Sequence, residues 1–104
     1  MNTLQSAVIE VLKNVAARFG KTVNVSEPKY SKDFRSDYIV VYLPEASITG
    51  SVFPKDANFW NSVGLDKRFE RIDFQSDAAM CNAIAAALTE ALMSVPHEKD
   101  GGPS

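Results

Sequence analysis

The spacing of apolar residues predicts a long helix at the start of the chain. From Leu4 to Phe19, apolar side chains recur every three or four residues, which is the periodicity of a helix with one buried face. Asn2 followed by Gln5 resembles a capping box, and Gly20 suits the left-handed residue that ends a helix. We therefore expect the first helix to end at Gly20.

A second long helix is expected near the end of the chain. Ser76 or Asp77 suits its N-cap, and Pro96 stops it after about Val95. Seven residues of this stretch are alanine, and large apolar residues lie between them. The helix is therefore apolar over most of its circumference, and we expect it to be covered on two sides.

Alternation of apolar and polar residues predicts strands between the two helices. The expected strands are Lys21–Glu27, Asp37–Leu43, Ala46–Phe53 and Lys67–Phe74. Asp37–Leu43 is apolar on both faces, which is typical of a central strand, whereas Lys21–Glu27 suits a sheet edge. The short link at Pro44 predicts an antiparallel hairpin between the second and third strands.

The remaining stretches carry weaker signals. Lys29–Ser36 is expected to be a polar loop. Asp56 suits the cap of a short helix that ends at Gly64. A bulge near Glu70 would correct the poor alternation of the last strand.

These elements predict an α+β domain. A small antiparallel sheet of about four strands is flanked by the N-terminal and C-terminal helices, and the short helix precedes the last strand. Residues 1–95 are expected to form one domain, and residues 96–104 a disordered polar tail. Both long helices are expected on one sheet face, which leaves the other face to loops, to Phe59 and Trp60, or to another chain.

Charge narrows the classes of partner. Of the 104 residues, 45% are hydrophobic and 23% charged, as in globular domains, and the formal net charge is −2. A general nucleic-acid binder needs a basic excess to release counterions from phosphates. The near-neutral charge therefore argues against nucleic acid, and against an anionic membrane surface, as the main partner.

Cysteine usage and targeting signals favour a cytoplasmic protein. Cys81 is the only cysteine, so no internal disulfide can form. The first residues lack the basic start and long apolar core of a signal peptide, and no stretch is apolar enough to span a bilayer. We expect a cytoplasmic protein with no membrane partner.

No constellation of residues predicts catalysis. The sole histidine, His97, lies in the polar tail, where it cannot be held as a catalytic base. Cys81 has no basic neighbour that would activate it. A carboxylate metal site would need Asp33, Asp37 or Asp73 to converge. We therefore expect no enzyme activity, no cofactor and no metal.

Aromatic residues supply the candidate partner-binding site. Phe59 and Trp60 lie next to each other, and Tyr30, Phe34 and Arg35 lie in the polar loop. Trp, Tyr and Arg are enriched in binding hot spots. The competing interpretation is that Trp60 fills one open end of the core, because a domain of this size has few large side chains.

Basic residues supply an alternative site. Lys29 and Lys32 alternate with aromatic residues in the polar loop, and Lys67, Arg68 and Arg71 form a second cluster. Bases stack on aromatic rings, and phosphates bind cations, so this combination could clamp single-stranded nucleic acid or a nucleotide. Acidic residues among these cations weaken the positive electrostatic potential that would attract phosphates.

The leading hypothesis is a small interaction module without catalysis. It would bind another protein as an inhibitor, an immunity or anti-defence factor, an adaptor or an assembly subunit, and a homodimer is a further candidate. Small phage-encoded or accessory proteins often act in this way. The alternative hypothesis is the nucleic-acid or nucleotide binder.

Overall fold

The chain runs from a helix through an antiparallel sheet to a second helix. The computed structural model describes residues 2–62 and 64–94. Its elements are α1 (Thr3–Arg18), β1 (Asn24–Val25), β2 (Lys29–Ser31), β3 (Ser36–Leu43), β4 (Ile48–Val52), β5 (Asp56–Trp60), β6 (Asp66–Glu70) and α2 (Asp77–Ser94), with short 3₁₀ turns at Pro44–Ala46 and Arg71–Asp73. The expected α+β class is confirmed, with six strands in place of about four.

The strand order is β1-β3-β4-β5-β6, and β2 pairs with the far end of β3. Every pairing is antiparallel. The predicted hairpin joins β3 to β4, with Leu43 opposite Ile48. As expected, β1 lies at an edge and the apolar β3 lies inside the sheet.

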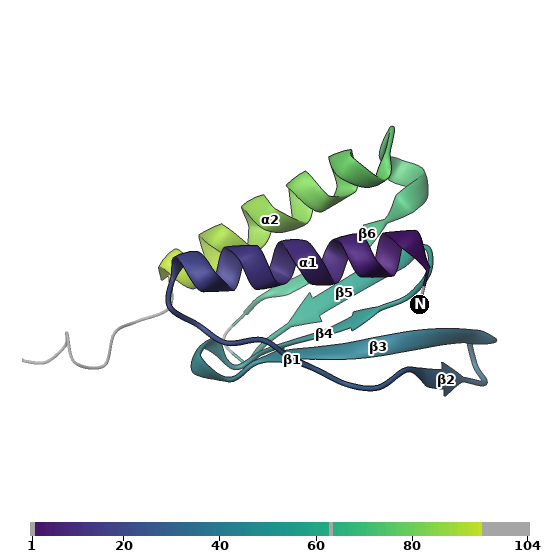
Figure 1. Ribbon diagram of the computed structural model, residues 1–104, viewed down its shortest axis with the longest axis horizontal. Coiled ribbons are helices and arrows are strands. Elements are labelled where there is room, and N and C mark those ends of the chain that lie inside the picture. The colour runs from purple at the N-terminus through teal and green to yellow at the C-terminus, as the bar shows by residue number, and fades with distance from the viewer. Residues whose placement is uncertain (1, 63, 95–104) are drawn as a thin grey trace, which may run out of the picture.

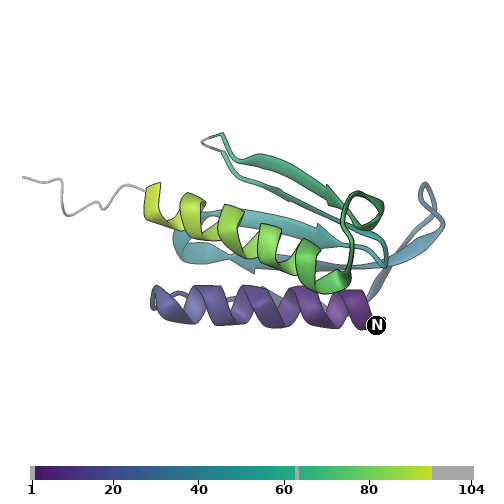
Figure 2. The same ribbon diagram turned by 90° about the horizontal axis from the view of Figure 1, so that it is seen from above.

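Both helices cover the same face of the sheet (Figure 1). Figure 2 shows α1 and α2 side by side over that face, and the two helices are in contact. The hairpin formed by β2 and β3 extends past the N-terminal end of α1 (Figure 1). Among the described residues, no helix lies on the opposite face, as expected from the sequence. This face is called the open face below.

The core lies between the helices and the sheet. Alternate residues of β3 point toward the helices, namely Ile39, Val41 and Leu43, and all three are buried. From the helices, the core receives two sets of buried residues: Leu4, Val8, Leu12 and Val15 of α1, and Met80, Ile84, Leu88 and Leu92 of α2. The helical and strand periodicities of the sequence therefore converge on one apolar layer.

The start of α1 is tied to the sheet by one buried polar side chain. Asn2 and Gln5 form the predicted capping box, in which each side chain accepts a hydrogen bond from the other residue's backbone N–H, at 2.8 and 2.9 Å. The Nε2 of Gln5 also donates to the Val52 carbonyl at 3.0 Å. Gln5 therefore satisfies three polar groups at once while only 2% exposed.

The predicted short helix is wrong, because the stretch that begins at Asp56 is strand β5. Ala57 and Phe59 point into the core, whereas Asp56, Asn58 and Trp60 alternate with them on the open face. This period of two suits a strand, and β5 pairs with β4 on one side and β6 on the other. Pairing on both sides outweighs the local capping signal of Asp56.

Two smaller predictions also need correction. A turn, and not a bulge, follows Glu70: residues Arg71–Asp73 form the 3₁₀ turn, which brings Phe74 back toward Phe69, with ring centroids 6.5 Å apart. The first part of the predicted polar loop is strand β2, because Tyr30 pairs with Asp37 of β3. Arg35 takes a left-handed conformation, with φ of 51°, in the turn between the two strands.

The expected polar tail, residues 96–104, and His97 within it lie outside the described residues. Within residues 2–62 and 64–94, neither helix has the length and apolar character that crossing a bilayer requires.

Candidate functional site

The open face is defined by the strand register. Cross-strand partners point to the same side of a sheet, so the register assigns the following residues to this face: Tyr38, Val40 and Tyr42 of β3; Thr49 and Ser51 of β4; Asp56, Asn58 and Trp60 of β5; Asp66, Arg68 and Glu70 of β6. Phe53 joins them, because its ring stacks on Tyr38 with centroids 5.2 Å apart.

The chemistry of the open face changes between β3 and β6. The β3 side is aromatic and aliphatic, whereas β6 contributes Asp66, Arg68 and Glu70. A sheet face that is only solvated normally carries polar residues along every strand. The aromatic side of this face is therefore the feature that needs a functional explanation.

One end of the open face presents two exposed aromatic side chains. Tyr42 is 40% exposed and Trp60 is 43% exposed. Thr49 lies between them, because it is the cross-strand partner of both. Two strand spacings place the backbones of Tyr42 and Trp60 about 10 Å apart. They form what we call the anchor pair, with a small polar residue between two large rings.

The other end of the open face is hollowed. A cavity of about 280 Å³ lies between the turn after β2 and the strands β5 and β6. Its apolar lining is Phe34, Phe53 and Pro54, and its polar lining includes Ser36, Asp56, Asn58 and Arg68. The Phe34 and Phe53 rings meet edge to face, with centroids 5.4 Å apart at 71°. This cavity is called the hollow below.

A charged network lies beside the hollow. Arg68 Nη2 is 3.0 Å from Asp56 Oδ2, and Arg68 Nε is 3.4 Å from Glu70 Oε2. The second oxygen of Asp56, Oδ1, is enclosed and has no hydrogen-bond partner. The guanidinium of Arg68 therefore pairs with two carboxylates, and one oxygen of Asp56 accepts no hydrogen bond.

The predicted partner-binding residues do not form one surface. Phe59 is 1% exposed and packs in the core, so it is left out of the open face. Trp60 points the opposite way, is exposed, and does not fill an end of the core. Phe34 lines the hollow at the other end of the face, while Tyr30 and Arg35 lie on the β2–β3 hairpin.

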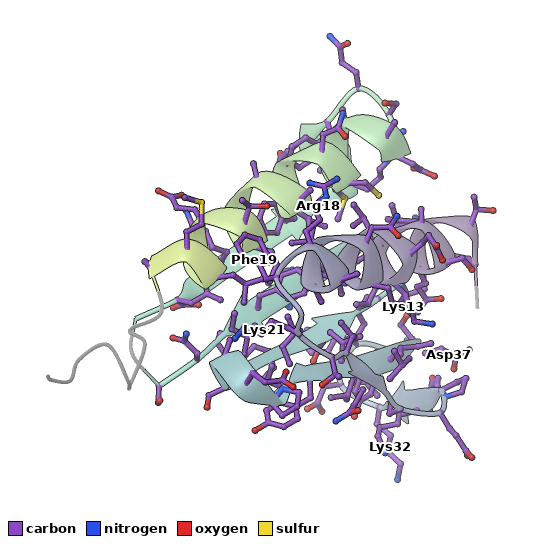
Figure 3. All side chains as sticks on the ribbon, turned by 60° about the vertical axis from the view of Figure 1, so that its left-hand side comes forward. Lys13, Arg18, Phe19, Lys21, Lys32 and Asp37 are labelled. Carbon is purple, nitrogen blue, oxygen red and sulfur yellow. The ribbon has the colours of Figure 1, made fainter. Side chains whose placement is uncertain are left out.

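The predicted basic residues are also divided. Lys67 and Arg68 are successive residues of β6 and so point to opposite faces. Arg71 is held by Asp77, with Nε 2.6 Å from Oδ1, and by the Phe74 carbonyl. Figure 3 shows Lys32 on the β2–β3 hairpin, far from Arg18 at the end of α1. Lys29 lies on β2 and is exposed, and as the cross-strand partner of Tyr38 it belongs to the open face as well.

The remaining candidates for chemistry stay apart. Among residues 2–62 and 64–94, no three His, Cys, Asp or Glu side chains gather in a metal-binding group, so Asp33, Asp37 and Asp73 do not converge there. Cys81 is buried in α2. Burial raises the pKa of its thiol, and the Asp77 carboxylate adds to that effect. The structure therefore gives this thiol no activation.

Sequence reasoning missed several residues of the open face. The sequence pattern places Phe53 at a strand end and Asp56 and Asn58 in a helix, so it does not predict their shared position at the hollow. The alternation of Tyr38 and Tyr42 did place those two on one face. Comparison with protein-family models, with curated proteins and with solved structures finds no match to this chain.

Proposed function

We propose that this protein is a non-catalytic interaction module that binds another protein through the open face of its sheet. The observation that carries the proposal is the anchor pair: Tyr42 and Trp60 stand exposed on the face of the sheet opposite α1 and α2. Exposed aromatic residues on a rigid strand lose little side-chain entropy on binding, which is why they dominate many interfaces.

The partner is expected to present an apolar patch flanked by basic residues. Along β5 and β6, the open face carries three carboxylates, Asp56, Asp66 and Glu70, and one guanidinium, Arg68. An acidic rim beside an aromatic strip attracts a surface of the complementary kind. Association should therefore slow as the salt concentration rises.

A continuous sheet formed by two copies is a weaker candidate. Two copies could pair antiparallel through β6, with the pairing centred on Arg68. Arg68 of one copy would then lie opposite Arg68 of the other, and Asp66 of each copy would lie opposite Glu70 of the other. Like charges directly opposite each other destabilise a strand pair, and charged residues on an edge strand normally prevent such pairing. The homodimer therefore ranks below a different protein as the partner. A cytoplasmic location belongs to the same proposal and is supported by the lone cysteine.

Capture of a partner with matched variants tests the proposal. The wild type and the Trp60→Ala, Tyr42→Ala and Ile72→Ala variants are immobilised and exposed to nuclease-treated host lysate. Ile72 is 85% exposed on the turn before α2, outside the open face, so it is the control. We expect one stoichiometric protein that is retained by the wild type and Ile72→Ala. Loss of a hot-spot residue should reduce its recovery about 30-fold.

The outcomes separate the candidates. Equal recovery by all four proteins would show that the open face is not the interface. Recovery of nothing but the bait would contradict the proposal, and sedimentation of the purified wild type would then show whether a second copy is the partner. The nucleic-acid alternative stays a prediction: binding of single-stranded DNA or RNA that falls steeply with salt would support it.

A further inference from the structure

We propose that the hollow is a binding site for a neutral aromatic ring that carries an N–H donor at its edge. The proposal concerns Phe34, Phe53 and the polar groups beside them, at the opposite end of the open face from the anchor pair. It does not depend on the proposed protein partner.

The size and walls of the hollow suit a single ring system. Its volume of about 280 Å³ is near the lower end of the range for ligand pockets, about 300–1,000 Å³. Phe34 and Phe53 meet at 71°, so they form a corner and not a closed stack. A third ring completes such a corner in the edge-to-face and offset arrangements that aromatic groups prefer.

The polar side of the hollow has oxygen atoms that can accept a hydrogen bond from a ligand. Within the described residues, the half-buried side-chain amide of Asn58 makes no hydrogen bond, so its oxygen is free to accept one. Asp56 Oδ1 next to it also lacks a partner, although it is enclosed. Both oxygens can only accept hydrogen bonds, so they suit an N–H at the edge of the ligand.

The charges of the hollow favour a neutral ligand over an ion. Arg68 is paired with Asp56 and Glu70, and Lys55 also lines the hollow. Two positive side chains thus stand against two carboxylates, so neither sign of charge is in excess there. A cation would meet Arg68, and an anion would meet the free oxygen of Asp56. Indole, as in a tryptophan side chain, and the amino-bearing edge of adenine share the required chemistry.

Titration with paired small molecules tests this site. Indole and 1-methylindole differ only in the N–H, and both are added to ¹⁵N-labelled protein while amide shifts are followed. We expect indole to give saturating shifts at residues 34, 36, 53, 58 and 68. We expect 1-methylindole to bind about fivefold more weakly, because it lacks one hydrogen bond.

Variants locate the site and its polar contact. Phe34 is 66% exposed, so Phe34→Ala should abolish the shifts without loss of the fold. Asn58→Ala should make the affinities for indole and 1-methylindole equal. Met93→Ala is the control, because Met93 is exposed on α2 outside the hollow, and it should behave as the wild type.

The source of the ring is then tested with N-acetyltryptophanamide, which represents a peptide side chain, and adenosine, which represents a nucleoside. The compound that binds more tightly identifies the source. Three results would overturn the proposal: no saturating shifts with any of these compounds, equal wild-type affinity for indole and 1-methylindole, or shifts that persist in Phe34→Ala.

Discussion

The ring of Phe59 occupies the space in which a side chain at Gly50 would stand. The two residues are cross-strand partners on the core face of β4 and β5. A Cβ at Gly50 would lie 2.5 Å from Cδ1 of Phe59 and 2.9 Å from Cγ2 of Val41. The glycine is therefore required by the packing of its neighbours on both adjoining strands.

Gly50→Ala is expected to destabilise the protein by about 1–3 kcal/mol, because overpacking forces the Phe59 ring and the strands to shift. Urea unfolding measures the change. Ser51→Ala is the matched control: it is the next residue of β4 and points to the open face. Equal stability of Gly50→Ala and the wild type would show that Phe59 is free to move away.

Gln5→Ala is expected to lower the free energy of unfolding by about 2 kcal/mol, because it removes a helix cap and leaves the Val52 carbonyl without its donor. Chemical denaturation measures the loss, and Ser6→Ala, at the exposed neighbouring position, is the control. A loss below about 0.5 kcal/mol would contradict the role given to Gln5.

Glu45 should make the fold sensitive to acid. Its carboxylate accepts hydrogen bonds from the Thr22 backbone N–H at 3.1 Å and from the Thr22 hydroxyl at 3.0 Å. The backbone N–H of Thr22 is the main cause that lowers the pKa of Glu45 below 4.5. Because the folded state favours the charged form, this contribution is present above pH 4.5 and is lost as the pH falls through the lowered value.

Glu45→Gln should therefore lose less stability than the wild type between pH 6 and pH 3. Urea unfolding at the two pH values measures both losses. Equal losses in the two proteins would show that the contacts with Thr22 contribute nothing to folding.

Cys81 should react slowly with alkylating reagents in the folded protein. It is buried, and burial raises the pKa of its thiol, so little thiolate is present near pH 8. We expect iodoacetamide to modify it at least about tenfold more slowly in buffer than in denaturing urea. Similar rates in both conditions would mean that α2 does not shield this thiol.

Local signals predicted the helices well. The capping residues Asn2 and Gln5 and the spacing of apolar residues after them are enough to define α1. Strand β5 could not be predicted in the same way, because only Ala57 and Phe59 mark its inner face and Asp56 resembles a helix cap. Pairing with β4 and β6 decides its conformation, and that pairing is not visible in a short window of sequence.

The open face was predicted only in part. Alternation along β3 placed Tyr38 and Tyr42 on one side, and the position of both helices left that side uncovered. The hollow could not be foreseen, because Phe34, Phe53 and Arg68 come from three separate parts of the chain. Sheet register, which brings them together, depends on contacts across the whole domain.

The environment of Trp60 tests the central claim most directly. Trp60 is the only tryptophan, so protein labelled with 5-fluorotryptophan gives one ¹⁹F signal from the open face. We expect host lysate to broaden or shift that signal, excess unlabelled wild type or Ile72→Ala to restore it, and unlabelled Trp60→Ala to leave it changed. A signal that lysate does not alter, or that Trp60→Ala restores equally well, would contradict partner binding through the open face.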